Sequence, residues 1–220
     1  TSPAGVFVNA AVINSVTVGD GTYGDTDVIS LTALFSQPVD VITTGGTPRI
    51  ALTVGGNSVF ADYVSGSGTT ALVFNHIVQT DDLDTDGIIV GTPVDLNGGT
   101  IRDTDSNNAV LTFTAPTTTA VLVDAVAPVA IAMAPPPGGS YVTNDVLSFD
   151  VVFDGNVEVA GTPMLPLTIG TTSRNAEYVS GTGTNTLTFE YTILSTDQDG
   201  DGITVDPTSI TTGITDAAGN

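Results

Sequence analysis

The stretch YVSGSGTTALVF (Tyr63 to Phe74) decides the fold class, because it recurs as YVSGTGTNTLTF (Tyr178 to Phe189), 115 residues later. The same frame places GTP (Gly46 to Pro48) on GTP (Gly161 to Pro163). Self-similarity at one fixed spacing indicates tandem copies of a structural unit. We therefore expect two homologous modules of roughly 100 residues each, the usual size of an immunoglobulin-type sandwich.

The residue pattern within each copy is that of short β-strands. Alternating runs such as VISLTALF (Val28 to Phe35) are separated by turn residues, and 25 Gly and 12 Pro disfavour helices. The segment Ser65 to Gly68 supplies the positive φ angles of a hairpin turn. The fold class we predict is all-β, with two tandem immunoglobulin-like β-sandwich domains. Six residues of the two hairpins are candidates for the inward face: Tyr63, Leu72, Phe74, Tyr178, Leu187 and Phe189.

The composition excludes several classes of partner. The formal charge is -21, from 21 Asp and 3 Glu against 3 Arg and no Lys. Nucleic acid and anionic membrane surfaces are disfavoured as partners, because both are bound through clustered Lys and Arg. The sequence has no Cys and no run of about 18 apolar residues, so we expect neither disulfides nor direct membrane insertion.

The sequence predicts a protein that is not an enzyme. The single imidazole, His76, lies on an alternating strand and is replaced by Tyr191 in the second copy. We therefore interpret His76 as a buried or half-exposed strand residue. The two copies also share no combination of nucleophile, base and acid that could form a catalytic site. We expect the scattered Arg49, Arg102 and Arg174 to form surface pairs with carboxylates.

Several spaced motifs carry a family resemblance. They are G-x-Y, a strand ending in F-S-x-P-V, GTP, YVSGSGT-x-x-L-x-F, D-x-D-x-D-G and I-x-D-x-x-x-N. The chain resembles the immunoglobulin-like or cadherin-like repeats of giant bacterial surface proteins, in particular the repeat named after cyanobacterial swimming-motility proteins and seen in biofilm adhesins. The resemblance implies an extracellular, cell-surface location and a load-bearing or adhesive role.

The D-x-D-x-D-G loops predict a cation site. Alternating carboxylates in a tight loop can converge on one ion, and calcium suits them better than magnesium, which requires stricter geometry. The alternative is that Asp and Gly form plain turns. The first copy offers Asp82, Asp84 and Asp86; the second offers Asp197, Asp199 and Asp201, with Asp206 as a further ligand.

The connector AVLVDAVAP (Ala120 to Pro128) adds one more candidate ligand. In cadherin-like modules an acidic loop lies near the end where the chain enters the next module. The resemblance thus implies that Asp124 joins the first acidic loop in an ion site that stiffens the junction. The alternative is a solvated linker residue.

The N-terminal segment AGVFVNA (Ala4 to Ala10) matches TAVLVDA (Thr119 to Ala125) in the repeat frame. We divide the chain into a connector or donor strand (residues 1–11), repeat 1 (12–124) and repeat 2 (125–220), whose last strand is missing. The simplest explanation is a fragment of a longer array. The second is that Val6, Phe7 and Val8 of one copy complete the sandwich of another and so build a fibre.

The function we expect is a non-enzymatic structural module of a surface protein or filament, stiffened by calcium. Its partners would be copies of itself or adjacent repeats. The alternative is a ligand-binding adhesin or a carbohydrate-binding module that recognises a surface glycan or protein.

Overall fold

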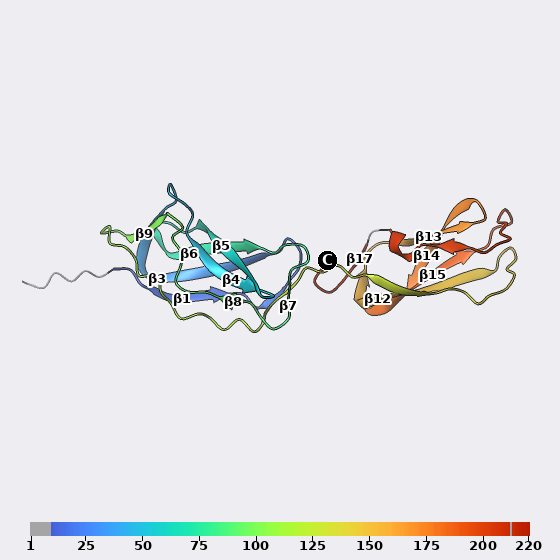
Figure 1. Ribbon diagram of the computed structural model, residues 1–220, viewed down its shortest axis with the longest axis horizontal. Helices are drawn as coiled ribbons and strands as arrows, with labels where there is room; N and C mark the ends of the chain where they lie inside the picture. Colours follow the sequence, from blue (N-terminus) through green and yellow to red (C-terminus); the bar gives the residue numbers. More distant parts are fainter. Residues whose placement is uncertain (1–9, 212) are drawn as a thin grey trace, which may run out of the picture. The chain divides into compact units, whose positions relative to one another are not determined.

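The computed structural model describes residues 10–211 and 213–220. The chain divides into two compact units, with the boundary between Val126 and Ala127. We call residues 10–126 module 1 and residues 127–220 module 2; Figure 1 colours their strands from blue to green and from yellow to red. In the described residues the only helical element is a short 3-10 helix, η1 (Pro207–Ser209). The predicted all-β fold is confirmed and is consistent with two sandwich-like domains. None of the described residues belongs to a helix that is long and apolar enough to span a membrane.

The main sheet of module 1 is antiparallel. Its strands lie in the order β1 (Ile13–Val18), β3 (Val28–Ile42), β6 (Thr69–Ile77), β5 (Asn57–Ser65), β4 (Arg49–Val54) and β8 (Ile89–Val90), and β9 (Thr100–Asp103) pairs with β3. The long strand β3 pairs regularly with β6 as far as Leu34 and with β9 from Val39 onward. Pro38 lies in the irregular stretch between them, where its missing N–H interrupts no regular ladder.

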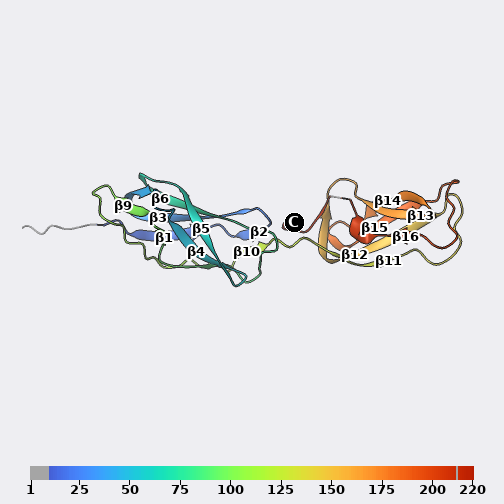
Figure 2. The same cartoon turned by 45° about the horizontal axis from the view of Figure 1, so that its top comes forward.

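A second, smaller sheet closes module 1. Its strands are β2 (Gly21–Tyr23), β10 (Val121–Asp124) and β7 (Leu83–Asp84), with β10 in the middle. Strand β10 runs parallel to β2 and antiparallel to β7, and Figure 2 shows β2 and β10 side by side. The segment that we expected to be a connector therefore also serves as the central strand of this sheet.

Module 2 repeats the main sheet of module 1. Its strands lie in the order β11 (Ala130–Ala134), β12 (Val146–Val159), β15 (Thr184–Thr192), β14 (Thr172–Ser180), β13 (Met164–Ile169) and β16 (Thr204–Val205), and β17 (Ile214–Thr215) pairs with β12. Among its described residues, no counterpart of the sheet β2-β10-β7 forms.

The two central hairpins agree residue by residue. Tyr63 lies opposite Phe74 in module 1, and Tyr178 lies opposite Phe189 in module 2. Each pair stacks edge to face, with ring centroids 5.9 Å and 6.0 Å apart, an arrangement that aromatic pairs prefer. The predicted hairpins are confirmed, because Gly66 and Gly181 adopt φ angles of 108° and 116° in the two turns.

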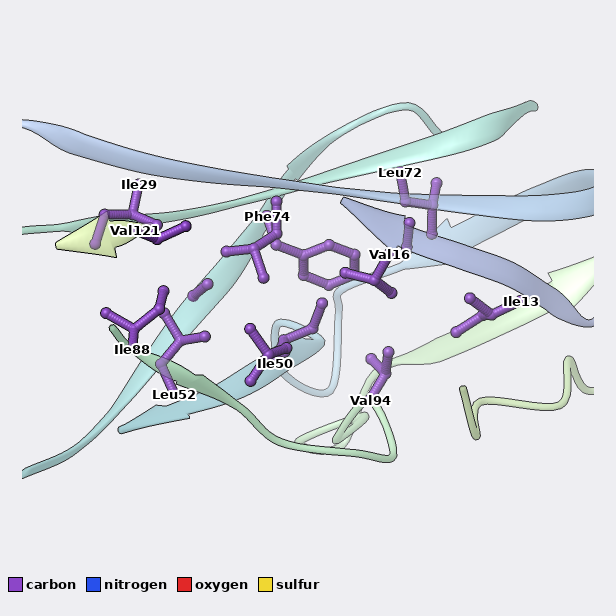
Figure 3. Close-up of a cluster of buried hydrophobic side chains, with 14 of the residues drawn as sticks. Ile13, Val16, Ile29, Ile50, Leu52, Leu72, Phe74, Ile88, Val94 and Val121 are labelled. Carbon is purple, nitrogen blue, oxygen red and sulfur yellow. The ribbon is translucent and has the colours of Figure 1, made fainter. Parts of the chain in front are cut away.

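Each module has its own apolar core. Leu72 and Phe74 are fully buried in one, Leu187 and Phe189 in the other, and the two tyrosines are partly buried beside them. Figure 3 shows the core of module 1, in which Val121 from β10 points toward the side chains that the main sheet contributes. The alternating burial of the strands explains this arrangement, since every second residue of a strand faces the same side.

Candidate functional site: two acidic loops and a groove

The acidic loop of module 1 is organised around Asp84. This side chain is buried, and its two oxygens accept hydrogen bonds of 2.8 Å from the backbone N–H groups of Gly87 and Gly55. Gly55 lies in the turn between β4 and β5, so Asp84 ties its own loop to a neighbouring hairpin. A side chain at position 55 would collide with the carbonyl oxygen of Leu83. The glycine is needed for that approach.

The other two carboxylates of this loop have different surroundings. Asp82 is half-buried and accepts the N–H of Gln79 at 2.9 Å. Asp86 is exposed, and its carboxylate accepts no hydrogen bond from the described residues. The three side chains therefore do not share one set of partners.

The acidic loop of module 2 repeats the first arrangement. Asp199 accepts the N–H groups of Gly170 at 2.8 Å and Gly202 at 2.6 Å, the counterparts of Gly55 and Gly87. Hydrogen bonds from Gly170, Gly202 and Asp201, in that order of strength, hold the pKa of Asp199 below the usual value of an aspartate. The main difference is exposure, since Asp84 is buried and Asp199 is exposed.

Asp197 has partners that its counterpart Asp82 lacks. Besides the Leu194 N–H at 2.9 Å, it accepts the Tyr191 hydroxyl at 2.7 Å and pairs with Arg174 at 2.7 Å. The carboxylate is 2 % exposed. Burial raises the pKa of Asp197, but the hydrogen bonds from Leu194, Tyr191 and Arg174 outweigh it and lower the pKa below the usual range. Our expectation of a surface pair is wrong for Arg174, because β14 brings it to a buried acid.

Module 1 has Val59 and His76 where module 2 has Arg174 and Tyr191. His76 is 8 % exposed, as expected for a buried strand residue, and its Nδ1 lies 3.1 Å from the carbonyl oxygen of Phe60. Its Nε2 is buried and has no hydrogen-bond partner among the described residues. Sequence reasoning missed the contact of Arg174, Tyr191 and Asp197. The available signal was that two positions differ together between otherwise similar copies.

The two remaining predicted ligands also take part in backbone structure. Asp124 lies opposite Leu83 in the β10–β7 ladder, so it is beside the acidic loop of module 1. Asp206 caps the 3-10 helix η1 by accepting the N–H of Thr208 at 3.0 Å. Hydrogen bonds from the Ser209 hydroxyl first, and then from Thr208, lower the pKa of Asp206.

The surroundings of these carboxylates bear directly on the predicted calcium site. Within residues 10–211 and 213–220, no group of three or more His, Asp or Glu side chains is arranged to hold a metal ion. The carboxylates of Asp84 and Asp199 instead organise turns, which was our stated alternative. Calcium binding at these loops stays a prediction. Val6, Phe7 and Val8, the predicted donor strand, lie outside the described residues.

Arg49 and Arg102 complete the set of cationic side chains. Arg49 pairs with Asp95 at 2.9 Å, both partly exposed, and lies 3.8 Å above the ring of Phe60. This is the surface pair that we expected. Arg102 forms no ion pair within the described part of the chain.

Module 2 contains a groove of about 790 Å³. It is lined by residues 135–141, which follow β11, and by the acidic loop from Asp197 to Gly202. Half-exposed apolar side chains of Met133, Tyr141 and Ile203 face it. Core residues also contribute to its lining: Leu147, Phe149, Ile169 and Ile193.

The comparisons with known proteins leave the family open. No family model matches the chain, and no curated protein matches it.

Proposed function

We propose that this chain is a non-enzymatic structural piece of an extracellular bacterial surface protein or filament, built from two tandem immunoglobulin-like repeats. The observation that carries the proposal is the equivalence of the two main sheets. Tyr63 and Phe74 occupy the same ladder position as Tyr178 and Phe189. Repetition of one unit lengthens a protein without changing its fold, and sandwich domains are common in cell-surface proteins.

The loops support the same proposal, because the same bonds stabilise corresponding turns in both modules. Asp84 and Asp199 each bind a glycine N–H of a neighbouring hairpin. Tyr23 and Tyr141 each donate a hydroxyl to the backbone four residues earlier, at 2.9 Å and 2.6 Å. Repeated structural bonds of this kind favour a spacer or load-bearing element.

Calcium stiffening is part of the proposal. Asp86 is exposed and accepts no hydrogen bond from the described residues, so its carboxylate is available to an ion. Asp124 lies beside the same loop, through its pairing with Leu83. A hard cation that prefers carboxylate and carbonyl oxygens would reduce the repulsion in a chain of net charge -21.

The rival function is a ligand-binding adhesin or carbohydrate-binding module. It gains some support from the groove of module 2, because such a function predicts a feature present in one copy only. The groove residues nevertheless have structural counterparts in module 1: Ile29 for Leu147, Val54 for Ile169 and Val78 for Ile193, all buried in its core. In module 1 the strand β10 packs against these counterparts. The groove of module 2 thus corresponds to the place that β10 occupies in module 1, which favours a structural function over a ligand-binding one.

Pulling the chain from both ends in a single-molecule force experiment tests the proposal. Two separate unfolding events are expected, each releasing about 3.3–3.6 Å of chain per residue. Immunolabelling of intact source cells should find the protein at the surface. Specific binding of the chain to a glycan array would favour the rival function.

A further inference from the structure

We propose that the outer face of the main sheet of module 1 binds the same face of a second copy of this chain, in a two-fold dimer. The outer face is the side of strands β3, β6, β5 and β4 that points away from the apolar core. This inference goes beyond the proposed function, because it concerns contact between separate chains rather than the two repeats within one. Two-fold contacts are the commonest way in which identical chains associate.

An apolar row crosses this outer face. Val28 of β3 lies opposite Ile77 of β6. Phe60 of β5 is level with Ile77, because each lies two residues beyond the pair formed by Asp62 and Asn75. Val28, Ile77 and Phe60 are 44 %, 54 % and 39 % exposed. Each is adjacent to a buried residue of its own strand, so the three side chains point outward together.

Module 2 does not carry this row. At the equivalent positions, Asn175 stands in place of Phe60 and Thr192 in place of Ile77, within the same ladders. Both side chains are polar and exposed. The main sheet therefore forms without an apolar row on its outer face, and the fold of module 1 does not require one. Exposed apolar surface that the fold does not require is typical of a contact site.

The charges on the outer face identify a second copy as the occupant. Arg49 of β4 lies opposite Asp62 of β5, and Ala51 lies opposite Phe60. A two-fold axis that runs along the strands, between β4 and β5, places each β4 residue over its own ladder partner in the other copy. Arg49 then faces Asp62 of the second copy, and Ala51 faces Phe60. The outer face is thus complementary to itself in charge, and its apolar side chains meet apolar side chains.

Arg49 is available for this contact. Within the described residues only its Nε–H donates a hydrogen bond, to Asp95 at 2.9 Å, so the other N–H groups of the guanidinium are left for a second acceptor. The guanidinium also lies 3.8 Å from the centre of the Phe60 ring. Because it covers one face of that ring, it disfavours a sugar that would have to stack there.

The same face of module 2 is unsuited to such a dimer. Glu177 lies opposite Glu190, where module 1 has Asp62 and Asn75. Two copies of that face would bring these glutamates together, and like charges at close range oppose binding. The dimer contact therefore belongs to module 1.

Sedimentation velocity of the full chain tests the dimer. The variant F60N/I77T gives module 1 the residues that the main sheet of module 2 accommodates. It should weaken dimerisation by about 100-fold or more, because each copy loses two apolar side chains from the contact. The control V146T changes a side chain of module 2 that is 49 % exposed and should leave dimerisation unchanged. A wild-type chain that stays monomeric at high concentration, or an equal loss with both variants, would overturn the proposal.

A charge exchange tests the two-fold geometry. R49D places an aspartate over Asp62 of the second copy, and D62R places an arginine over Arg49, so each variant alone should be monomeric. Mixing the two restores opposite charges at both places, and we expect a heterodimer from the mixture. Urea unfolding checks that each variant is folded. A folded mixture that stays monomeric would overturn the proposal, while two unfolding events under force would still support the proposed function.

Discussion

The backbone N–H of Ile88 donates a hydrogen bond to the carbonyl oxygen of Val121 at 3.2 Å, and both side chains are almost completely buried. This bond joins the segment after the acidic loop to β10, the central strand of the small sheet. Because β10 also pairs with β2 and β7, it connects three parts of module 1 that are far apart in sequence. The same three-part connection is missing from the described residues of module 2.

Replacing Val121 by Ala should destabilise module 1 and leave module 2 unchanged. Loss of buried methyl groups from a packed core costs about 2 kcal/mol in the free energy of unfolding. Urea unfolding, followed by signals that separate the modules, should show one transition shifted to lower urea. The control V126A removes a side chain that is 37 % exposed and should shift neither transition. A shift of both transitions would contradict the assignment of β10 to module 1 alone.

Two variants of the first acidic loop separate calcium binding from turn formation. Asp84→Asn should lower the melting temperature with and without calcium, because the Asp84 carboxylate accepts two backbone N–H groups. Asp86→Asn should lower it only in calcium, since Asp86 accepts no hydrogen bond from the described residues. Thermal unfolding in calcium and in a chelator measures both. Identical melting temperatures of the wild-type chain in the two buffers would contradict calcium binding.

The contact of Arg174 with Asp197 should contribute more to stability than the contact of Arg49 with Asp95. Asp197 is 2 % exposed and Asp95 is 48 % exposed, so only the first loses a buried charge partner when its arginine is removed. We expect R174M to lower the free energy of unfolding more than R49M does, but less than the loss of a fully buried pair would, because Arg174 is itself 22 % exposed. R49M is the matched control, with about 0–1 kcal/mol from its ion pair. Equal losses in chemical unfolding would show that burial of the acid is unimportant.

The lowered pKa of Asp199 predicts a pH-dependent effect of Asp199→Asn. The folded-state pKa lies below that of an unfolded aspartate, about 3.9, so the ionised side chain stabilises the folded state above that pH. This contribution is lost as the pH falls through the folded-state pKa. The difference in unfolding free energy between wild type and D199N should therefore be constant from pH 7 to about pH 5 and shrink below about pH 4. A difference that grows toward low pH would have the wrong sign.

The sequence predicted the parts of the fold that depend on local patterns. YVSGSGTTALVF contains two alternating runs and a glycine turn, which specify a hairpin and its inward face. It did not predict that β10 pairs in parallel with β2, because residues 121 and 21 are brought together only by the folded sheets. Long-range parallel pairing leaves no local periodicity of its own.

The acidic loops show that a sequence motif alone does not determine what a site does. D-x-D-x-D-G suits a cation loop and a hydrogen-bonded turn equally well, because both use carboxylate oxygens and a glycine. The choice depends on what surrounds each oxygen. For Asp84 that includes the N–H of Gly55, 29 residues earlier. The Arg174–Asp197 contact was missed for the same reason, since it depends on the register of β14 rather than on sequence spacing.

Amide hydrogen exchange at Ile88 and Ile203 tests the central claim most directly. The measurement compares the two equivalent amides within one chain. We predict that Ile88 is protected, because its N–H donates to the carbonyl oxygen of Val121, and that Ile203 exchanges fast, because its N–H has no backbone partner in the described part of module 2. Fast exchange at Ile88, or protection of Ile203 equal to that of Ile88, would contradict two modules that share a main sheet and differ at β10.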